Sequence, residues 1–183
     1  MITVSTAQPG DVPAIVGLLE ELGRYYGVTE TETRGRRMGQ VSEMLFGSPP
    51  TAYVLLARDA DGAATGDGDE AADPDREGPA WEEAGWDGGL VAGMAAYSFL
   101  WPTVGTARSL FLKELYVAEG YRRRGVGKAL MRAVFETATV LGCVRVEWTA
   151  DPGNTAAQAF YAGLGMGTHP KVFYRVESWT SLL

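Results

Sequence analysis

The stretch YRRRGVGKALM, residues 121–131, combines four basic side chains with two glycines in a chain whose net charge is −7. It follows the apolar stretch SLFLKELYV (109–117) and precedes a helical pattern, so the glycines lie between an expected strand and an expected helix. The first amides of a helix have no partner within the helix, and the helix dipole adds partial positive charge there. Glycine at positions 125 and 127 lets an anion approach the backbone closely. The stretch therefore predicts a site for a phosphate or diphosphate group.

Two well-known phosphate loops do not fit this stretch. A Walker loop requires glycine where the chain has Arg122, and Ser or Thr where it has Ala129. A dinucleotide-binding loop requires a third glycine where the chain has Leu130. Nucleic acid is a weaker alternative, because the basic cluster is small and the net charge is negative. A basic, solvated helix start without any ligand is the remaining alternative.

Composition sets the general class of protein. The chain has 183 residues, of which 46% are apolar, and it has no apolar run long enough to cross a membrane. Residues 1–10 do not resemble a secretory signal. Cys143 is the only cysteine, which excludes an internal disulfide and any multi-cysteine metal site. We therefore expect a cytoplasmic protein that is neither a membrane nor a metal protein.

Acidic residues are concentrated in one segment. Residues 59–89 contain eleven Asp or Glu and one basic residue, Arg76, whereas the remainder has 12 acidic against 15 basic residues. The segment is rich in Gly, Ala, Pro and Asp and shows no apolar periodicity, which is typical of a flexible loop. We expect a single domain over residues 1–183 with an acidic loop insertion at 59–89. The loop could steer cationic molecules electrostatically or be a solvated insertion without such a role.

The hydrophobic pattern predicts an α/β (α+β) protein with one mixed sheet and helices packed on its faces. Strand–helix–strand order dominates the second half, and residues 59–89 join two strands that we expect to be neighbours. The expected strands cover residues 2–7, 51–58, 90–99, 109–117, 143–150 and 171–177. The first expected helix follows Asp11, which can cap it, and a second spans about 30–45. Two further expected helices extend from Gly125 to Gly142 and from Asn154 to Gly165.

Two motifs resemble those of the GNAT N-acetyltransferase family. Arg122-Arg123-Arg124-Gly125-Val126-Gly127 is similar to the family's Arg/Gln-x-x-Gly-x-Gly/Ala loop, which follows a hydrophobic strand. About thirty residues later, DPGNTAAQAFYAGLGM (151–166) is similar to the family's second motif, and DVPAIVGLLEEL (11–22) is similar to its first helix. The resemblance covers nearly the whole chain except the acidic loop. It implies a mixed, mostly antiparallel sheet flanked by helices.

The resemblance also implies that acetyl-coenzyme A is the acyl donor. The amides of residues 124–129 would hold its diphosphate, and the three arginine side chains would neutralise the charge. The splayed end of the 109–117 strand would pair with the pantetheine arm, to which Asn154 would also hydrogen-bond. The implied donor-binding residues are Leu115, Tyr116, Val117, Arg122, Arg123, Arg124, Gly125, Val126, Gly127, Lys128, Ala129, Asn154, Ala157 and Phe160.

Tyr161 occupies the position of the family's general acid, which protonates the departing coenzyme A sulfur; the alternative is a core aromatic residue. Glu114 is the candidate general base, because an amine with a pKa near 10.4 must lose a proton before it can attack. A carboxylate paired with a nearby arginine is an equally good interpretation of Glu114. Glu119 and Glu147 are weaker candidates, and a water chain could replace a single base.

The acceptor is less well defined by the sequence. YSFLWPTVG (97–105) followed by 109–117 is similar to the spermidine and diamine acetyltransferase branch, but Lys113 stands where that branch has an acid. Strand alternation puts Lys113 and Glu114 on opposite faces unless a bulge intervenes. His169 is expected to have a surface or structural role rather than a catalytic one, and Cys143 to be a buried thiol rather than a nucleophile. Aromatic residues that could line an acceptor cleft, or simply belong to the core, are Tyr25, Tyr26, Tyr97, Phe99 and Trp101.

The leading hypothesis is transfer of an acetyl group to a primary amine by direct attack in a ternary complex. The acceptor would be a small molecule; the alternatives are a protein or peptide amine, a longer acyl group, or a non-catalytic acyl-coenzyme A-binding regulatory module. No nucleic-acid or membrane partner is expected. Members of the family often dimerise, so the resemblance also implies a homodimer as a candidate state.

Overall fold

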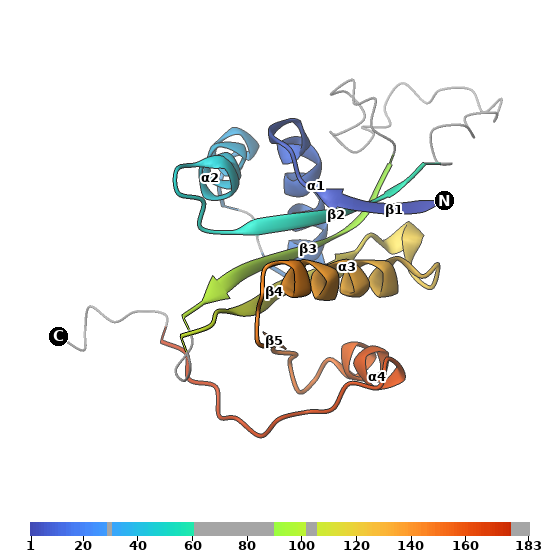
Figure 1. The fold of residues 1–183 in the computed structure, drawn as a ribbon. Helices are drawn as coiled ribbons and strands as arrows, with labels where there is room; N and C mark the ends of the chain where they lie inside the picture. The colour runs from blue at the N-terminus through green and yellow to red at the C-terminus, as the bar shows by residue number, and fades with distance from the viewer. Residues whose placement is uncertain (29–30, 61–89, 102–105, 177–183) are drawn as a thin grey trace. The chain divides into compact units, whose positions relative to one another are not determined.

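The computed structural model describes residues 1–28, 31–60, 90–101 and 106–176. They form two compact units, Met1–Thr149 and Ala150–Leu183. The first contains a five-stranded sheet of order β1-β2-β3-β4-β5, antiparallel except for the β4–β5 pair (Figure 1). The strands are β1 (Ile2–Thr6), β2 (Tyr53–Asp59), β3 (Leu90–Leu100), β4 (Ser109–Val117) and β5 (Val146–Trp148). The helices of this unit are η1 (Pro9–Asp11), α1 (Val12–Tyr25), α2 (Arg34–Phe46), η4 (Glu119–Tyr121) and α3 (Val126–Val140).

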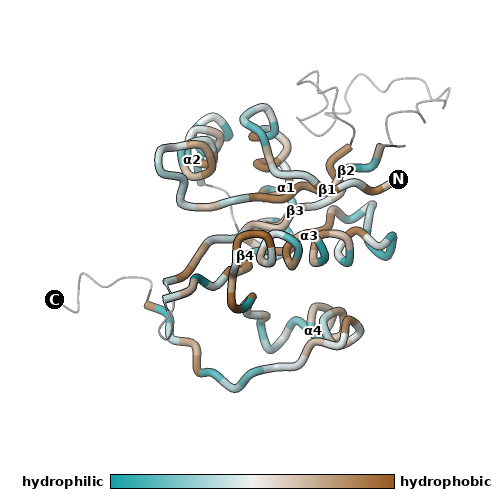
Figure 2. The backbone as a smooth tube through the Cα atoms, in the orientation of Figure 1, coloured by the Kyte–Doolittle hydropathy of each residue, from teal (hydrophilic) through white to brown (hydrophobic). Residues whose placement is uncertain are grey.

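Helices cover both faces of the sheet. α1 and α2 lie on one face and α3 on the other (Figure 1). The core under α1 and α2 includes Ile15, Val16, Val54, Leu56 and Met94. Val54 and Leu56 are two residues apart on β2, as expected when every second side chain of a strand points to the same face. The central strands are hydrophobic along most of their length, whereas the helices alternate between hydrophobic and hydrophilic residues (Figure 2). The predicted α/β class with a mostly antiparallel sheet flanked by helices is confirmed.

β2 and β3 pair along most of their length, so the segment that joins them is an insertion between neighbouring strands, as predicted. Residues 61–89 of that acidic segment lie outside the described residues, as do Trp81 and Trp86. The single-domain assignment with an acidic loop at 59–89 stays a prediction.

Three local predictions are wrong. Asp11 precedes α1 but does not cap it: its carboxylate accepts from the amide of Gln8 (2.7 Å) and pairs with Arg58 (2.7 Å). The strand expected over 143–150 is shortened to β5 (Val146–Trp148). The part of the expected last strand that the structure describes, residues 171–176, contains no strand, and its apolar residue Val172 is 75% exposed.

The second unit contains α4 (Thr155–Gly163). Asn154 caps its first turn by accepting a hydrogen bond from the amide of Ala157 (3.0 Å). Gly165 follows the helix with a positive φ of 77°, the left-handed conformation that glycine adopts most easily at a helix end. Both ends of this helix are where the sequence predicts them.

Candidate active site

The N-terminus of α3 has the geometry of an anion cradle. Gly125 is the N-cap residue with φ of 83°, and Arg123, two residues earlier, also has a positive φ of 63°. Such alternation of backbone conformation directs successive amides to one side of the chain. In the described part of the chain, the amides of Val126, Gly127 and Lys128 have no backbone acceptor.

Ala129 corrects the expected extent of this cradle. Its amide donates to the carbonyl of Gly125 (3.0 Å), because Gly125 is the N-cap and its carbonyl begins the helical hydrogen-bond pattern. The amides that are left for a ligand therefore end at Lys128.

The three arginines before the cradle have different environments. Arg122 donates to the carbonyl of Val117 (3.3 Å), and its guanidinium lies over the ring of Tyr25. Arg124 lies near Asp59 (3.7 Å) and over the ring of Tyr121. Arg123 is exposed, and no ion pair of its side chain occurs within the described ranges. Of the three, Arg123 is thus the one whose charge is most available to an anion.

The end of β4 next to the cradle is not paired with β5. The parallel pairing covers Leu110 to Leu112 on β4, whereas β4 continues to Val117. Among the described residues, Leu115, Tyr116 and Val117 therefore pair with β3 and not with β5. This separation agrees with the splayed strand that the resemblance implies, and it leaves backbone groups for an extended ligand.

A β-bulge determines the direction of Glu114. Ala96 on β3 pairs with Glu114, but the next residue, Tyr97, pairs with Leu112, so Lys113 is the extra residue. Ala96 packs against the α1–α2 core, and paired residues share a face. Glu114 therefore faces α1 and α2.

Leu112, two residues before Glu114, lies on the opposite face. Leu112 pairs with Tyr97, and Tyr97 pairs with Tyr53, so the three side chains share one face. Tyr53 is next to Val54, whose side chain lies in the α1–α2 core, and neighbouring residues of a strand point to opposite faces. The bulge at Lys113 thus switches the face of the following residues.

The environment of Glu114 suits proton transfer. The side chain is half-buried, and burial raises the pKa of its carboxyl above the ordinary value, while neighbouring Lys113 partly opposes the rise. Where the structure describes the chain, no arginine forms an ion pair with Glu114, so the alternative of a carboxylate paired with an arginine is not supported. Lys113 itself is exposed. The two weaker candidates differ: Glu147 pairs with Arg145 (3.0 Å), and Glu119 is exposed.

The second unit holds the other predicted site residues on α4. Phe160 and Tyr161 pack edge to face, with ring centroids 5.2 Å apart, and both are half-buried. The Oδ1 atom of Asn154 and the amide of Ala157 satisfy each other, so a ligand contact of Asn154 would use its side-chain NH2. The roles of Tyr161 as acid and of Asn154 as pantetheine ligand stay predictions.

The aromatic candidates divide into two groups. Tyr97 and Phe99 pack against Tyr53, which no sequence motif marks, at centroid distances of 5.5 and 5.3 Å, and against each other at 5.8 Å. Tyr25 and Tyr26 are each 55% exposed. Trp101 is 86% exposed, which excludes it from the core.

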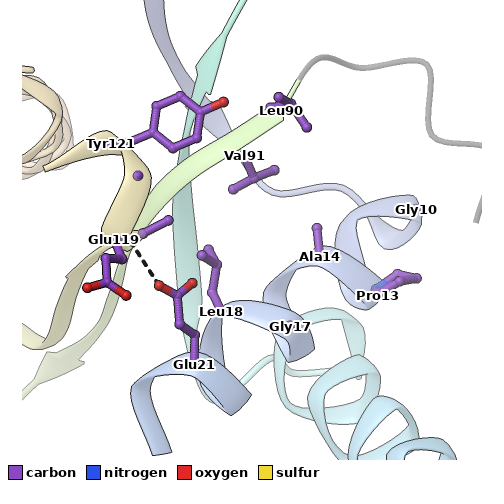
Figure 3. Close-up of a pocket in the computed structure, with 12 residues that line it drawn as sticks. Gly10, Pro13, Ala14, Gly17, Leu18, Glu21, Leu90, Val91, Glu119 and Tyr121 are labelled. Atoms are coloured by element: carbon purple, nitrogen blue, oxygen red, sulfur yellow. Dashed lines mark hydrogen bonds between the residues drawn. The ribbon is translucent and has the colours of Figure 1, made fainter. Parts of the chain in front are cut away.

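A cavity of about 250 Å³ lies between α1 and the turn that leads to the cradle (Figure 3). Its walls come from η1 and α1, the start of β3, and residues 118–121. Glu21, which the sequence reading did not identify, lines it and accepts a hydrogen bond from the amide of Glu119 (2.8 Å). No local motif marks Glu21, because its partners are nearly a hundred residues away.

His169 is exposed, as a surface residue would be, and Cys143 is a free thiol that is half-buried rather than buried. Within residues 1–28, 31–60, 90–101 and 106–176, no cluster of His, Cys, Asp and Glu is arranged to hold a metal ion. No helix in these ranges is long and apolar enough to cross a membrane.

A helix N-terminus that can hold an anion lies next to a separated strand end in a mixed sheet. This is the arrangement that the acetyltransferase resemblance implies. The model of the Acetyltransferase (GNAT) family matches residues 44–166. The chain belongs to this family, which confirms the resemblance drawn from its two motifs.

Individual relatives add detail. The chain is 34% identical over 76 residues to L-ornithine N5-acetyltransferase NATA1 of Arabidopsis thaliana, covering 42% of this chain and 33% of that protein. It is 33% identical over 78 residues to thialysine N-epsilon-acetyltransferase of Mus musculus, covering 43% of this chain and 45% of that protein. The match thus spans less than half the length of either relative.

Solved structures share the fold. Integron cassette protein VCH_CASS6 from the mobile metagenome of V. cholerae has a TM-score of 0.73 at 22% identity, over 97% of this chain and 93% of that one. AAC(6')-Iy in complex with the bisubstrate analogue CoA-S-monomethyl-acetylneamine has a TM-score of 0.66 at 19% identity, over 97% and 99% of the two chains. At these identities the likeness concerns the fold alone.

Proposed function

We propose that the protein transfers an acetyl group from acetyl-coenzyme A to a primary amine of a small molecule, by direct attack in a ternary complex. The observation that carries the proposal is the α3 N-terminus, where the amides of Val126, Gly127 and Lys128 lack backbone acceptors in a chain of the GNAT family. Diphosphate is the anion that such a row of amides suits.

The donor site would extend from the cradle to the strand edge. The amides of residues 125–128 would hold the diphosphate, and exposed Arg123 would add charge. Leu115 and Val117, on the part of β4 without a β5 partner, would pair with the pantetheine amides in the manner of an added strand. Asn154, Ala157 and Phe160 would contact the same arm.

The chemistry requires two proton transfers. The amine nitrogen attacks the thioester carbonyl carbon, forming a C–N bond as the C–S bond breaks. Glu114, directly or through water, takes the proton that the amine must lose, and its raised pKa brings it nearer to the working pH of a general base. Tyr161 gives its hydroxyl proton to the departing sulfur. The products are an N-acetylated amine and free coenzyme A.

Several relatives support an amine on a small molecule as acceptor. By their names, the plant and mouse relatives acetylate the side-chain amines of ornithine and thialysine, and a bacterial relative from Salmonella typhimurium acetylates an aminoglycoside at N6'. Each of these acceptors presents a primary amine.

The test is release of free thiol from acetyl-coenzyme A with a panel of ornithine, lysine analogues, polyamines, aminoglycosides and peptides. We expect turnover with at least one small amine. Turnover with peptides alone would replace the small-molecule acceptor by a protein acceptor. Binding of acetyl-coenzyme A without turnover would support the regulatory module instead.

A further inference from the structure

A chain of polar contacts connects α1 with the start of the anion cradle. The carboxylate of Glu21 on α1 accepts from the amide of Glu119, 2.8 Å away. The same carboxylate is close enough to Tyr116 to help raise the pKa of its hydroxyl. The guanidinium of Arg122 lies 3.5 Å from the same hydroxyl and donates to the carbonyl of Val117 (3.3 Å). These contacts fix residues on both sides of the turn that precedes Arg123.

The cavity explains why polar contacts matter at this turn. It separates the α1 face around Ala14 and Gly17 from residues 118–121, so apolar packing between them is incomplete (Figure 3). Glu21 lies at one end of the cavity, where its hydrogen bond to Glu119 bridges the two walls (Figure 3). Ala14 and Gly17 on the α1 wall are small, which leaves space next to them. The position of the turn therefore depends strongly on the carboxylate of Glu21.

Arg122 is exposed, but its guanidinium contacts several groups of the protein itself. Its guanidinium lies over the rings of Tyr25 (5.6 Å) and Tyr116 (5.9 Å), besides its contact with the Val117 carbonyl. A guanidinium held by these groups is directed toward α1. The charge of a diphosphate is then met by the loop amides and by Arg123.

The hydroxyl of Tyr116 acts as the link between the two charged groups. Burial and then the nearby Glu21 raise its pKa to about 12, so the hydroxyl is un-ionised at neutral pH beside the Glu21 carboxylate. Its oxygen can at the same time accept from Arg122. Removing the hydroxyl removes both contacts and leaves the ring in the α1–α2 core.

We propose that Glu21 and Tyr116 are positioning residues that hold residues 118–122, and through them the cradle amides, in the conformation that binds the diphosphate of the donor. The inference rests on the proposed function. It concerns side chains that need not touch the donor and act through Glu119 and Arg122.

The experiment compares two acetyl donors, acetyl-coenzyme A and acetyl-pantetheine, which lacks the diphosphate. In Tyr116→Phe and Glu21→Ala we expect the KM for acetyl-coenzyme A to rise about tenfold, the effect of losing a hydrogen bond to a charged group. The KM for acetyl-pantetheine and the KM for the acceptor should stay within about twofold. Glu21→Gln should recover most of the loss, because its carbonyl can still accept from Glu119.

Glu20→Gln is the matched control. Glu20 is adjacent on α1 but pairs with Arg34 (2.7 Å) and Arg37 (3.3 Å) of α2. This variant should lower the melting temperature without a selective effect on acetyl-coenzyme A. If Tyr116→Phe and Glu21→Ala impaired both donors equally, or neither, the positioning role would be excluded. If the wild-type protein used neither donor, the proposed function itself would fail.

Discussion

Gly93 on β3 lies directly opposite Val117 on β4, closer than any other residue type would allow. A Cβ atom at position 93 would be 2.5 Å from the carbonyl oxygen of Tyr116, 3.2 Å from the Cα of Val117 and 3.3 Å from a methyl group of Val126. Glycine is therefore required where the last residues of β4 and the first residue of α3 meet the sheet.

Gly93→Ala should destabilise the protein by about 1–3 kcal/mol, because β4 or α3 must shift to admit the methyl group. The shift would move the cradle, so the affinity for coenzyme A should also fall. Thermal or urea unfolding and calorimetry of coenzyme A binding measure the two effects. Gly39→Ala on α2 is the control: its Cβ meets nothing within 4 Å, and it should stabilise the helix by roughly 0.5–1 kcal/mol.

Gly125→Ala tests the conformation of the cradle. An alanine at φ of 83° should cost about 1–2 kcal/mol, and relaxation of that strain would turn the following amides away from a ligand. We expect weaker binding of coenzyme A, measured by calorimetry, because fewer amides can donate to the diphosphate. Gly120→Ala in the preceding turn has open space and no positive φ, so equal losses in the two variants would contradict the argument.

Glu114→Gln should remove the acid limb of the pH–rate profile and lower turnover about 10²–10⁴-fold. The wild-type limb should lie above the ordinary pKa of a glutamate, because burial raises the pKa of Glu114. Rescue of the variant at high pH, where the amine is already neutral, would agree with its role as base. A profile that is unchanged in the variant would assign the limb to another group.

The raised pKa of Glu114 suits a general base, but it also means that the ionised carboxylate lowers the stability of the folded protein at neutral pH. A carboxyl whose folded pKa is raised binds its proton more tightly when folded, so its contribution to stability is present below the unfolded pKa and is lost as the pH rises through the folded pKa. Glu114→Gln should therefore raise the melting temperature at neutral pH relative to wild type. The advantage should vanish below about pH 4, the range of an unfolded glutamate.

Tyr161→Phe should reduce turnover by about 10²–10⁴-fold and leave coenzyme A binding unchanged, because only the hydroxyl is lost. The edge-to-face packing with Phe160 does not need that hydroxyl, so the variant should keep this ring contact. Phe160→Leu is the complementary variant: it alters the packing and leaves the hydroxyl. Normal turnover in Tyr161→Phe would remove this residue from the mechanism.

The parts of the fold that sequence predicted well are those with local causes. The cap at Asn154, the end at Gly165 and the loop around Gly125 each depend on a residue's own backbone preference or its near neighbours. Asp11 has the right residue type for a cap, but a tertiary ion pair with Arg58 takes its carboxylate. Local signals could not reveal that competition.

The candidate site shows the same limit. The motif identified the cradle, but only the strand register shows which face carries Glu114, and only the tertiary contacts show that Arg122 is held by Tyr116 and Val117. Glu21 escaped notice because its partners are Glu119 and Tyr116, which are far away in the sequence. Side chains that act across the fold leave no periodic pattern.

The extra residue in β4 has a consequence for how homologues and engineered variants should be compared. Because Lys113 is the extra residue opposite the step from Ala96 to Tyr97, deleting it would give β4 regular alternation and leave the carboxylate of Glu114 on the α1–α2 face, whereas a regular strand that kept Lys113 would turn the carboxylate to the opposite face. Two chains that align here without a gap can therefore present this glutamate on opposite faces, and two chains that differ by one residue can present it on the same face.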